Sequence, residues 1–338
     1  MKKIRVGING FGRIGRAFFR ATLFDSEMQV VAINDLAGTK TLAYLLSHDS
    51  IYGELENVSG RTGKLITRQG EIPVSSVPDP AQIPWDGVDI VVECTGRFTE
   101  YSQSSEHLHN GVKHVVISAP GRGEGVTALV GINEHDLSKT NVSSNASCTT
   151  NAVSPILAIL SETVGIKKSI LSTVHAYTAS QSLVDNATSS HDLRRMRAAA
   201  ENIIPTTTGS ASSIISAMPD QKNQFDAIAI RVPAPAVSLI DLTLLSERPT
   251  SIDEINVTLA TASTQDRWQG IFTATDEPLV SSDIIGNPYA SIADLSMTNV
   301  VGGDLIKVFA WYDNEFGYAN TLLRHVISAA KHLPRSTS

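Results

Sequence analysis

Short apolar runs of strand length alternate with helical stretches through residues 1–147. The strand-like runs are 4–9, 29–34, 89–93 and 114–118, and the helical stretches are 16–24 and 103–109. Strands that alternate with helices are typical of βαβ units, in which the helix returns the chain for a parallel strand. This part of the chain is therefore predicted to form a parallel sheet flanked by helices.

The pattern changes after residue 148, where the strand-like runs become longer and several alternate strictly between apolar and polar residues. These runs are 225–232, 238–245 and 305–312, with a helix predicted near 251–263 and another over 315–331. Alternation of this kind is typical of strands with one covered face, as in antiparallel sheets. We therefore expect an α/β chain with a second, α+β domain over 148–314, built on a mixed, mostly antiparallel sheet.

A glycine motif joins the first predicted strand to the first predicted helix. Gly10, Gly12 and Gly15 allow a tight turn, a close backbone approach to a pyrophosphate, and close packing of the helix on the strand. Asp35 ends the second strand, where a carboxylate suits ribose hydroxyls. Three glycines could also form a mere tight loop, but strand, helix and acid together favour dinucleotide binding. Residues 1–147, completed by a C-terminal helix within 315–338, are predicted to form a Rossmann-type domain.

Cys148 is the main candidate for a reactive group. It precedes the apolar run 152–164, which is predicted to be a helix, and a helix N-terminus favours a thiolate and lowers the pKa of a cysteine. His175 ends the β-branched run 169–174, so a strand could direct its imidazole at the sulfur. The alternative reading is an inert, buried cysteine, which is common in intracellular proteins.

The composition excludes several classes of function. The chain has 34 acidic and 27 basic residues and a net charge of −7, which gives no electrostatic footprint for nucleic acid or anionic membrane. No apolar stretch is long enough for a signal or a membrane span. The only cysteines are Cys94 and Cys148, without a ligand cluster, so neither a disulfide nor a metal site is indicated. We expect a cytoplasmic protein.

The second half of the chain also carries groups that suit anions. Thr206, Thr207, Thr208 and Gly209 precede a helical run, so hydroxyls and amide hydrogens could converge on a phosphate. Arg231 ends an otherwise apolar strand, and its guanidinium favours an anion as partner. The cluster Arg194, Arg195 and Arg197 could serve an anion, a solvated helix face or a subunit interface, and we favour the interface for Arg197.

Taken together, these motifs resemble phosphorylating glyceraldehyde-3-phosphate dehydrogenases over essentially the whole chain. The resemblance rests on residues 9–16 (NGFGRIGR), 144–151 (SNASCTTN), 173–178 (TVHAYT) and 311–315 (WYDNE). It implies that Cys148 is the nucleophile and His175 the base, that no metal takes part, and that a nicotinamide cofactor, sugar phosphate and inorganic phosphate bind.

The resemblance also implies a role for individual residues. Cofactor contacts are expected from Gly10, Gly12, Arg13, Ile14, Asp35, Thr95, Ser118 and Asn314. The substrate's own phosphate is expected at Thr178 and Arg231. The incoming inorganic phosphate is expected at Ser147, Thr149, Arg194, Arg195, Thr208 and Gly209.

Loop 179–192 departs from the family pattern and affects the expected cofactor. It resembles the family's S-shaped loop, which reaches a neighbouring subunit of a homotetramer, but it has Ser182 where a basic residue is usual. Asp35 should repel a 2′-phosphate, whereas small loop residues leave room for one, so we expect NAD with some use of NADP. Erythrose-4-phosphate dehydrogenase is the nearest alternative function, and a noncatalytic binding protein on the same scaffold is a more distant one.

Overall fold

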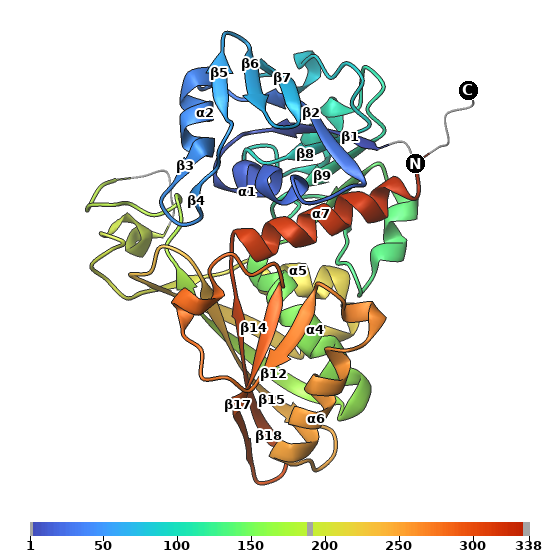
Figure 1. Cartoon of the computed structure of the whole chain (residues 1–338). Helices are drawn as coiled ribbons and strands as arrows, with labels where there is room; N and C mark the ends of the chain where they lie inside the picture. The colour runs from blue at the N-terminus through green and yellow to red at the C-terminus, as the bar shows by residue number, and fades with distance from the viewer. Residues whose placement is uncertain (1–2, 188–191, 334–338) are drawn as a thin grey trace. The chain divides into compact units, whose positions relative to one another are not determined.

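The computed structural model, shown in Figure 1, describes residues 3–187 and 192–333. Part of the predicted S-shaped loop (188–191) and of the predicted C-terminal helix (334–338) therefore lies outside the described residues. The described chain divides into two compact units. One comprises the chain up to Ala146 together with the segment from Ala319, and the other extends from Ser147 to Tyr318.

The first unit is built on a largely parallel sheet. Its strands are β1 (Ile4–Asn9), β2 (Met28–Asn34), β5 (Ser59–Arg61), β6 (Lys64–Thr67), β7 (Gly70–Ser75), β8 (Ile90–Glu93), β9 (His114–Ile117), β10 (Val126–Thr127) and β11 (Val142–Ser144). They lie in the order β10-β11-β9-β8-β1-β2-β7-β6-β5, and only β5, β6 and β7 pair antiparallel. The chain moves from β1 to β2 on one side and later to β8 on the other. Ligands of such sheets bind at the carboxyl ends of the strands where the order switches.

Helices cover this sheet and close its core. They are α1 (Arg13–Thr22), α2 (Thr39–Ser47), α3 (Tyr101–Ser104) and α7 (Phe316–Ala330), and a short ribbon pairs β3 (His48–Asp49) with β4 (Gly53–Glu54). Leu322 and Val326 of α7, the red helix in Figure 1, are buried in one cluster with Ile8 of β1 and Phe18 of α1. Helix α7 thus completes the hydrophobic core of the first unit.

The second unit contains the mixed sheet that the alternating pattern predicts. Its strands are β12 (Ile166–Ala176), β13 (Ile204–Thr207), β14 (Phe225–Val232), β15 (Ser238–Ser246), β16 (Phe272–Thr275), β17 (Ser291–Val301) and β18 (Leu305–Tyr312), in the order β13-β14-β12-β15-β18-β17-β16. β12 pairs parallel with β14 and β16 with β17, while the other neighbours pair antiparallel. The predicted fold class, a parallel sheet followed by a mostly antiparallel one, is confirmed.

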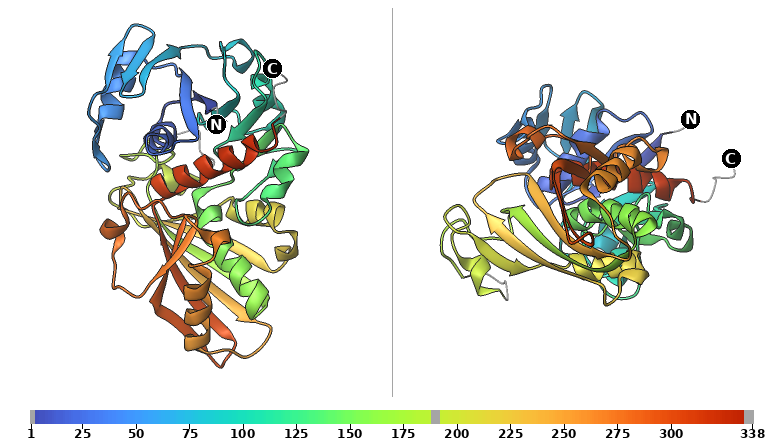
Figure 2. Two further views of the ribbon diagram at one scale, coloured as in Figure 1. Left: turned by 45° about the vertical axis from the view of Figure 1, so that its right-hand side comes forward. Right: turned by 90° about the horizontal axis from the view of Figure 1, so that it is seen from below.

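Helices α4 (Cys148–Thr163), α5 (Ser210–Ala217) and α6 (Ile252–Ala262) pack on one face of this second sheet (Figure 2). Side chains on the covered face are buried, as in β15, whose residues alternate strictly between buried and half-buried. α4 is buried over most of its length, which explains why its sequence is almost continuously apolar. The helix begins at Cys148 and not at residue 152 as predicted, because Ser147 caps it and the polar residues 148–151 form its first turn.

A chain of buried polar groups in the first unit links β9, β11 and α7. His325 Nδ1 lies 3.2 Å from Asn145 Oδ1 and its Nε2 lies 2.7 Å from Ser143 Oγ, which is also 2.8 Å from His114 Nε2. Because an amide oxygen only accepts, His325 carries its proton on Nδ1 and accepts the Ser143 hydroxyl proton at Nε2. Both imidazoles are therefore neutral links in the chain.

These histidines predict a loss of stability in acid. Burial lowers the pKa of His114 to about 4 and that of His325 to about 3, whereas the unfolded value is about 6.5. The unfolded chain therefore binds more protons between these limits, and the unfolding free energy falls as pH drops, by about 2 kcal/mol per histidine between pH 7 and 5. Urea unfolding at several pH values measures this slope. His325→Gln should be less stable at pH 7 and should show a shallower slope, and an unchanged slope would contradict the assignment.

Candidate active site

Cys148 and His175 meet at the start of α4 in the second unit. Cys148 is the first residue of the helix, and the Ser147 side chain caps it by accepting a hydrogen bond from Thr150 N. His175 lies near the end of β12, and its Nε2 is 3.4 Å from Cys148 Sγ. The distance allows a proton to pass from the thiol to the imidazole.

The protonation of the thiol differs from the sequence-based expectation. Burial raises the pKa of Cys148, while the charge of Arg231 and hydrogen bonds from Thr149 oppose the rise. The expected lowering at a helix N-terminus is therefore wrong for the ligand-free site, because removing water from a thiolate costs more than the helix end returns. The thiol needs a base to become nucleophilic.

His175 is suited to be that base. Burial lowers its pKa to about 3, and the charges of Arg231 and Arg195 contribute to the shift. Its Nδ1 lies 2.7 Å from the carbonyl oxygen of Ala176. Arg231 Nη1, which can only donate, lies 2.8 Å from the same nitrogen and also donates to the Ala176 carbonyl, so Nδ1 has both a donor and an acceptor beside it. In the tautomer whose Nδ1–H donates to the Ala176 carbonyl, Nε2 presents its lone pair to the thiol. A proton transferred from Sγ to Nε2 leaves the net charge of the pair unchanged, so burial opposes this transfer less than it opposes either charge alone.

A chain of hydroxyl groups connects the helix that carries Cys148 with the strand that carries His175. The sequence analysis did not identify it. Tyr312 is fully buried at the end of β18, and its hydroxyl lies 2.9 Å from Thr149 Oγ1 and 2.8 Å from Thr173 Oγ1. Thr173 in turn donates to the carbonyl of Leu239. The Tyr312 ring also meets the His175 ring edge-on, with centroids 5.9 Å apart. Tyr312 thereby fixes the helix turn that carries the thiol and the strand that carries the base.

Arg231 lies beside the pair formed by Cys148 and His175. Its Nη1 is 2.8 Å from both His175 Nδ1 and the carbonyl oxygen of Ala176. Its Nε is buried and has no hydrogen-bond partner among the described residues. A buried guanidinium with an unused donor suits an anion, as the sequence suggested.

The other predicted phosphate ligands form a second group in the same unit. Thr208 Oγ1 lies 2.9 Å from Ser210 Oγ, and Ser147 Oγ lies 3.4 Å from the same atom, so these hydroxyls are neighbours. Gly209 is the N-cap of α5 and has no side-chain cap. Arg195 donates from Nε to Thr206 Oγ1 at 2.8 Å.

The other two predicted ligands, Arg194 and Thr178, make only local hydrogen bonds within the part of the chain that the structure describes. The backbone amide of Arg194 donates to Asp192, and its side chain is exposed. The Thr178 hydroxyl pairs with Ser180 at 3.0 Å. No contact in the described structure joins either residue to Cys148 or His175.

Asn314 is held at the end of the second sheet. It is 4% exposed, and its Oδ1 accepts a hydrogen bond from Ser238 Oγ at 3.2 Å. Ser238 Oγ also accepts from Ala176 N, next to His175. A fixed amide near His175 suits recognition of a carboxamide.

The glycine motif of the first unit shapes a second candidate site. Gly10 has φ +89°, and a Cβ atom there would lie 2.7 Å from Thr95 N, so only glycine fits. A Cβ at Gly15 would lie 2.2 Å from the carbonyl oxygen of Gly10. Gly12 is the N-cap of α1, has no side-chain cap, and faces open space. The start of α1 thus offers an uncapped N-terminus, the arrangement that binds pyrophosphate.

Next to it lies a cavity of about 200 Å³ that Asp35 and Thr95 help to line. Asp35 is held in place, because Oδ2 accepts from Phe11 N at 2.7 Å and Oδ1 from Ala37 N at 2.8 Å. Each carboxylate oxygen keeps a further lone pair for a ribose hydroxyl. The uncapped helix, the carboxylate and the cavity fit a dinucleotide.

The side chains of the remaining predicted cofactor residues, Arg13, Ile14 and Ser118, contact other parts of the protein. The Arg13 side chain turns to Asp49, with Nη1 2.5 Å from Oδ2, and Ile14 packs against the hydrophobic core. Their side chains therefore do not point at the helix end. Ser118 directly follows β9, where its amide donates to the carbonyl of Glu93, and its hydroxyl forms a hydrogen bond with Cys94.

Comparisons with known proteins show which family the chain belongs to. Residues 4–101 match the family model for the glyceraldehyde 3-phosphate dehydrogenase NAD binding domain, and residues 147–314 match the model for its C-terminal domain. Glyceraldehyde-3-phosphate dehydrogenase 1 of Bacillus cereus is 44% identical over 324 residues, covering 94% of this chain and 96% of the relative. The Streptomyces coelicolor and Geobacillus stearothermophilus enzymes of that name are 46% and 44% identical, covering 95% of this chain and 96% of each relative. The chain therefore belongs to the glyceraldehyde-3-phosphate dehydrogenase family.

Proposed function

We propose that this protein catalyses the reversible phosphorylating oxidation of glyceraldehyde 3-phosphate to 1,3-bisphosphoglycerate. The observation that carries the proposal is the 3.4 Å contact between Cys148 Sγ and His175 Nε2 beside the buried cation Arg231. A nucleophile, a base and an anion site then lie within one cluster. A hydrolase with a Cys–His pair would not need a dinucleotide-binding site such as the one proposed for the first unit.

The reaction begins when the Cys148 thiol adds to the aldehyde carbon. His175 Nε2 takes the thiol proton, and Arg231 and Thr178 hold the phosphate of the substrate. The resulting oxyanion is stabilised by the Cys148 amide at the start of α4 and by the protonated imidazole. The imidazolium then returns its proton to this oxyanion, which gives a thiohemiacetal on Cys148 and leaves His175 neutral again.

Oxidation then converts the thiohemiacetal to a thioester. The nicotinamide cofactor supplies the hydride acceptor, and His175 takes the hydroxyl proton. Inorganic phosphate, held by Arg195 and the hydroxyl group around Ser147 and Thr208, attacks the thioester carbon. The C–S bond breaks, which releases an acyl phosphate and restores Cys148.

The test compares glyceraldehyde 3-phosphate with erythrose 4-phosphate, each with and without inorganic phosphate, and follows formation of the reduced cofactor. We expect the triose phosphate to give the higher kcat/KM and turnover to depend on inorganic phosphate. Preference for the tetrose phosphate would support the alternative, erythrose-4-phosphate dehydrogenase. No reduction with either sugar would support a noncatalytic binding role.

The proposed cofactor is NAD, with some use of NADP. Two backbone amides donate hydrogen bonds to the Asp35 carboxylate and fix its position. The carboxylate therefore cannot rotate away to relieve its repulsion of the 2′-phosphate of NADP. Asp35→Ser is therefore expected to raise kcat/KM for NADP by about tenfold and to lower it for NAD. Steady-state kinetics with both cofactors measure this, with Glu27→Gln as a surface control. If Asp35→Ser keeps the original ratio of kcat/KM for NAD and NADP, Asp35 does not determine the cofactor preference.

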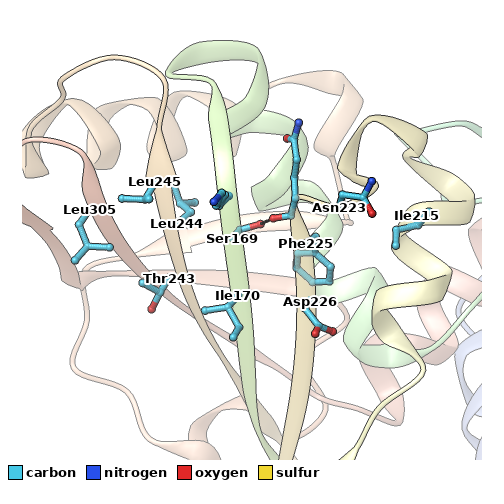
Figure 3. Close-up of a pocket in the computed structure, with 12 residues that line it drawn as sticks. Ser169, Ile170, Ile215, Asn223, Phe225, Asp226, Thr243, Leu244, Leu245 and Leu305 are labelled. Carbon is cyan, nitrogen blue, oxygen red and sulfur yellow. Dashed lines mark hydrogen bonds between the residues drawn. The ribbon is translucent and has the colours of Figure 1, made fainter.

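We also propose that the protein forms a homotetramer, as the family resemblance implies. The face of the second sheet opposite its helices is open and partly apolar, with Ile170 53%, Ile228 48% and Leu305 40% exposed. A cavity of about 620 Å³ opens at one end of this face, and Figure 3 shows Ile170, Thr243 and Leu305 around it. A large exposed apolar face supports association with another protein surface.

Ile170→Asp should break this association, because it buries a charge in the proposed interface. Light scattering is expected to show a smaller species than the original protein. Ile252→Asp is the matched control, since Ile252 is similarly exposed at the start of α6, where an acid is tolerated. An unchanged assembly with Ile170→Asp would exclude this face as the interface.

We place the protein in the cytoplasm. Both cysteines are free thiols, which suits a reducing compartment. Among the described residues, no helix is long and apolar enough to cross a membrane, and no cluster of potential metal ligands occurs.

A further inference from the structure

The first unit contains a carboxylate that the proposed reaction does not use. Glu93 ends β8 and is 1% exposed. Among the described residues its only ion-pair partner is His107, itself fully buried, and no lysine or arginine reaches it. Burying a carboxylate without a strong cation is unfavourable unless hydrogen bonds replace its water.

Hydrogen bonds do replace that water. Oε1 accepts from Thr95 N at 2.7 Å and from Thr95 Oγ1 at 2.5 Å. Oε2 accepts from Asn9 Nδ2 at 2.6 Å and lies 3.2 Å from His107 Nε2. Trp85 Nε1 can only donate, and it lies 3.1 Å from His107 Nδ1, so the His107 proton is on Nε2 and points at Glu93. Thr95 N, Asn9 Nδ2 and His107 Nε2 therefore all face the carboxyl oxygens as donors.

The same bonds connect the walls of the cofactor cavity. Thr95 and Asn9 both line the cavity of about 200 Å³ that Asp35 also lines. Asn9 Oδ1 accepts from Asn34 Nδ2 at 2.8 Å, and Asn34 Oδ1 accepts from Val77 N at 2.9 Å. Through these hydrogen bonds, Glu93 holds Asn9, Asn34 and Thr95 in one arrangement at the ends of β1, β2 and β8.

We infer that Glu93 is a positioning residue for the cofactor, one that sets the adenosine end of the cavity through Thr95 and Asn9 without touching the ligand. The inference rests on the proposed use of a nicotinamide dinucleotide. Among the described residues, the side chain of Glu93 pairs with no lysine or arginine, and its hydrogen bonds join only Thr95, Asn9 and His107. His107 and Trp85 close the far side of the carboxylate.

The first test is Glu93→Gln, which replaces one acceptor oxygen by an NH₂ group. Either the Thr95 donors or the Asn9 and His107 donors then face another donor. We expect the Kd for NAD and for ADP-ribose, measured by calorimetry, to rise by about tenfold or more. The KM for the sugar phosphate and the kcat at saturating NAD should stay within about threefold.

The second test restores the lost complementarity. In Asn9→Asp alone two carboxylates lie close together, so binding should weaken strongly. In Glu93→Gln combined with Asn9→Asp, the new amide can donate to the new carboxylate while its oxygen still accepts from Thr95. The His107 Nε2–H, 3.4 Å from the replaced Asn9 Nδ2, can donate to the same carboxylate. We expect the double variant to bind NAD within about threefold of the original protein.

A surface control, the original protein and the thermal stability of each variant distinguish failure of the inference from failure of the proposed function. The surface variant Glu106→Gln, on the same turn as His107, should bind NAD like the original protein. Unchanged affinity in Glu93→Gln, or a double variant no better than the weaker single variant, would overturn the inference. If the original protein itself does not bind NAD, the proposed function fails, and this is seen before any variant is made. Thermal unfolding of each variant identifies one that fails to fold, and the double variant then carries the test.

Discussion

Replacing Cys148 by serine is expected to lower kcat for cofactor reduction by about 10⁴-fold or more. A serine hydroxyl ionises far less readily than a thiol, and the neutral His175 beside it cannot compensate for this difference at neutral pH. An alcohol also gives an ester, which transfers its acyl group to phosphate less readily than a thioester. Absorbance of the reduced cofactor under steady-state conditions measures the loss.

Cys94→Ser is the matched control for this experiment. Burial raises the pKa of Cys94 to about 12, so this thiol cannot act as a nucleophile near neutral pH. We expect the control to keep activity within about threefold of the original protein. Near-normal activity in Cys148→Ser, or its loss in Cys94→Ser with the fold intact, would contradict the assignment.

Replacing His175 by glutamine is expected to lower kcat by about 10²–10⁴-fold at neutral pH. The amide can still hydrogen-bond the sulfur, but it cannot accept the proton. Because burial raises the pKa of Cys148, the variant has to wait for the thiol to ionise by itself. Its activity should therefore rise with pH, and the deficit relative to the original protein should shrink in alkali.

A pH profile of kcat measures this prediction. His135→Gln, at an exposed position with a side chain 75% accessible, is the control and should follow the original profile. A deficit of constant size at every pH would mean that His175 orients the substrate but does not remove a proton.

The fold could be predicted largely from local patterns. Parallel strands buried on both faces are short and apolar, as in β8 with the sequence IVVE, and they stand out between helical stretches. Strands with one covered face alternate, as in β15. The start of α4 was predicted too late because polar residues in a first turn resemble a loop. Their role as a helix start depends on the Ser147 cap, which spacing alone does not show.

The candidate site was predictable where one residue type has few uses. A glycine that must adopt φ +89°, or a cysteine followed by a histidine at the end of a strand, leaves a recognisable trace in the sequence. The direction in which a side chain points leaves no such trace in the sequence. Nothing near Arg13 in sequence indicates that it turns to Asp49, and the Asp49 partner comes from a different element.

Contacts between distant segments explain most of what was missed. The Tyr312 hydroxyl reaches Thr149 and Thr173, which are 163 and 139 positions away. The 311–315 motif marked this region as important, but its tyrosine could be placed only once the strand pairing was known. The sign of the Cys148 pKa shift was missed for the same reason, because the depth of burial depends on the packing of the whole sheet.

The central claim is that the oxidised substrate is held as a thioester on Cys148. Mass spectrometry of the protein mixed with glyceraldehyde 3-phosphate and NAD, without inorganic phosphate, tests this claim most directly. The account predicts one phosphoglyceroyl group on the peptide that contains Cys148, removed when phosphate is added. Reduced cofactor formed in stoichiometric amount with no acyl group on that peptide, or with the group on Cys94, would contradict it.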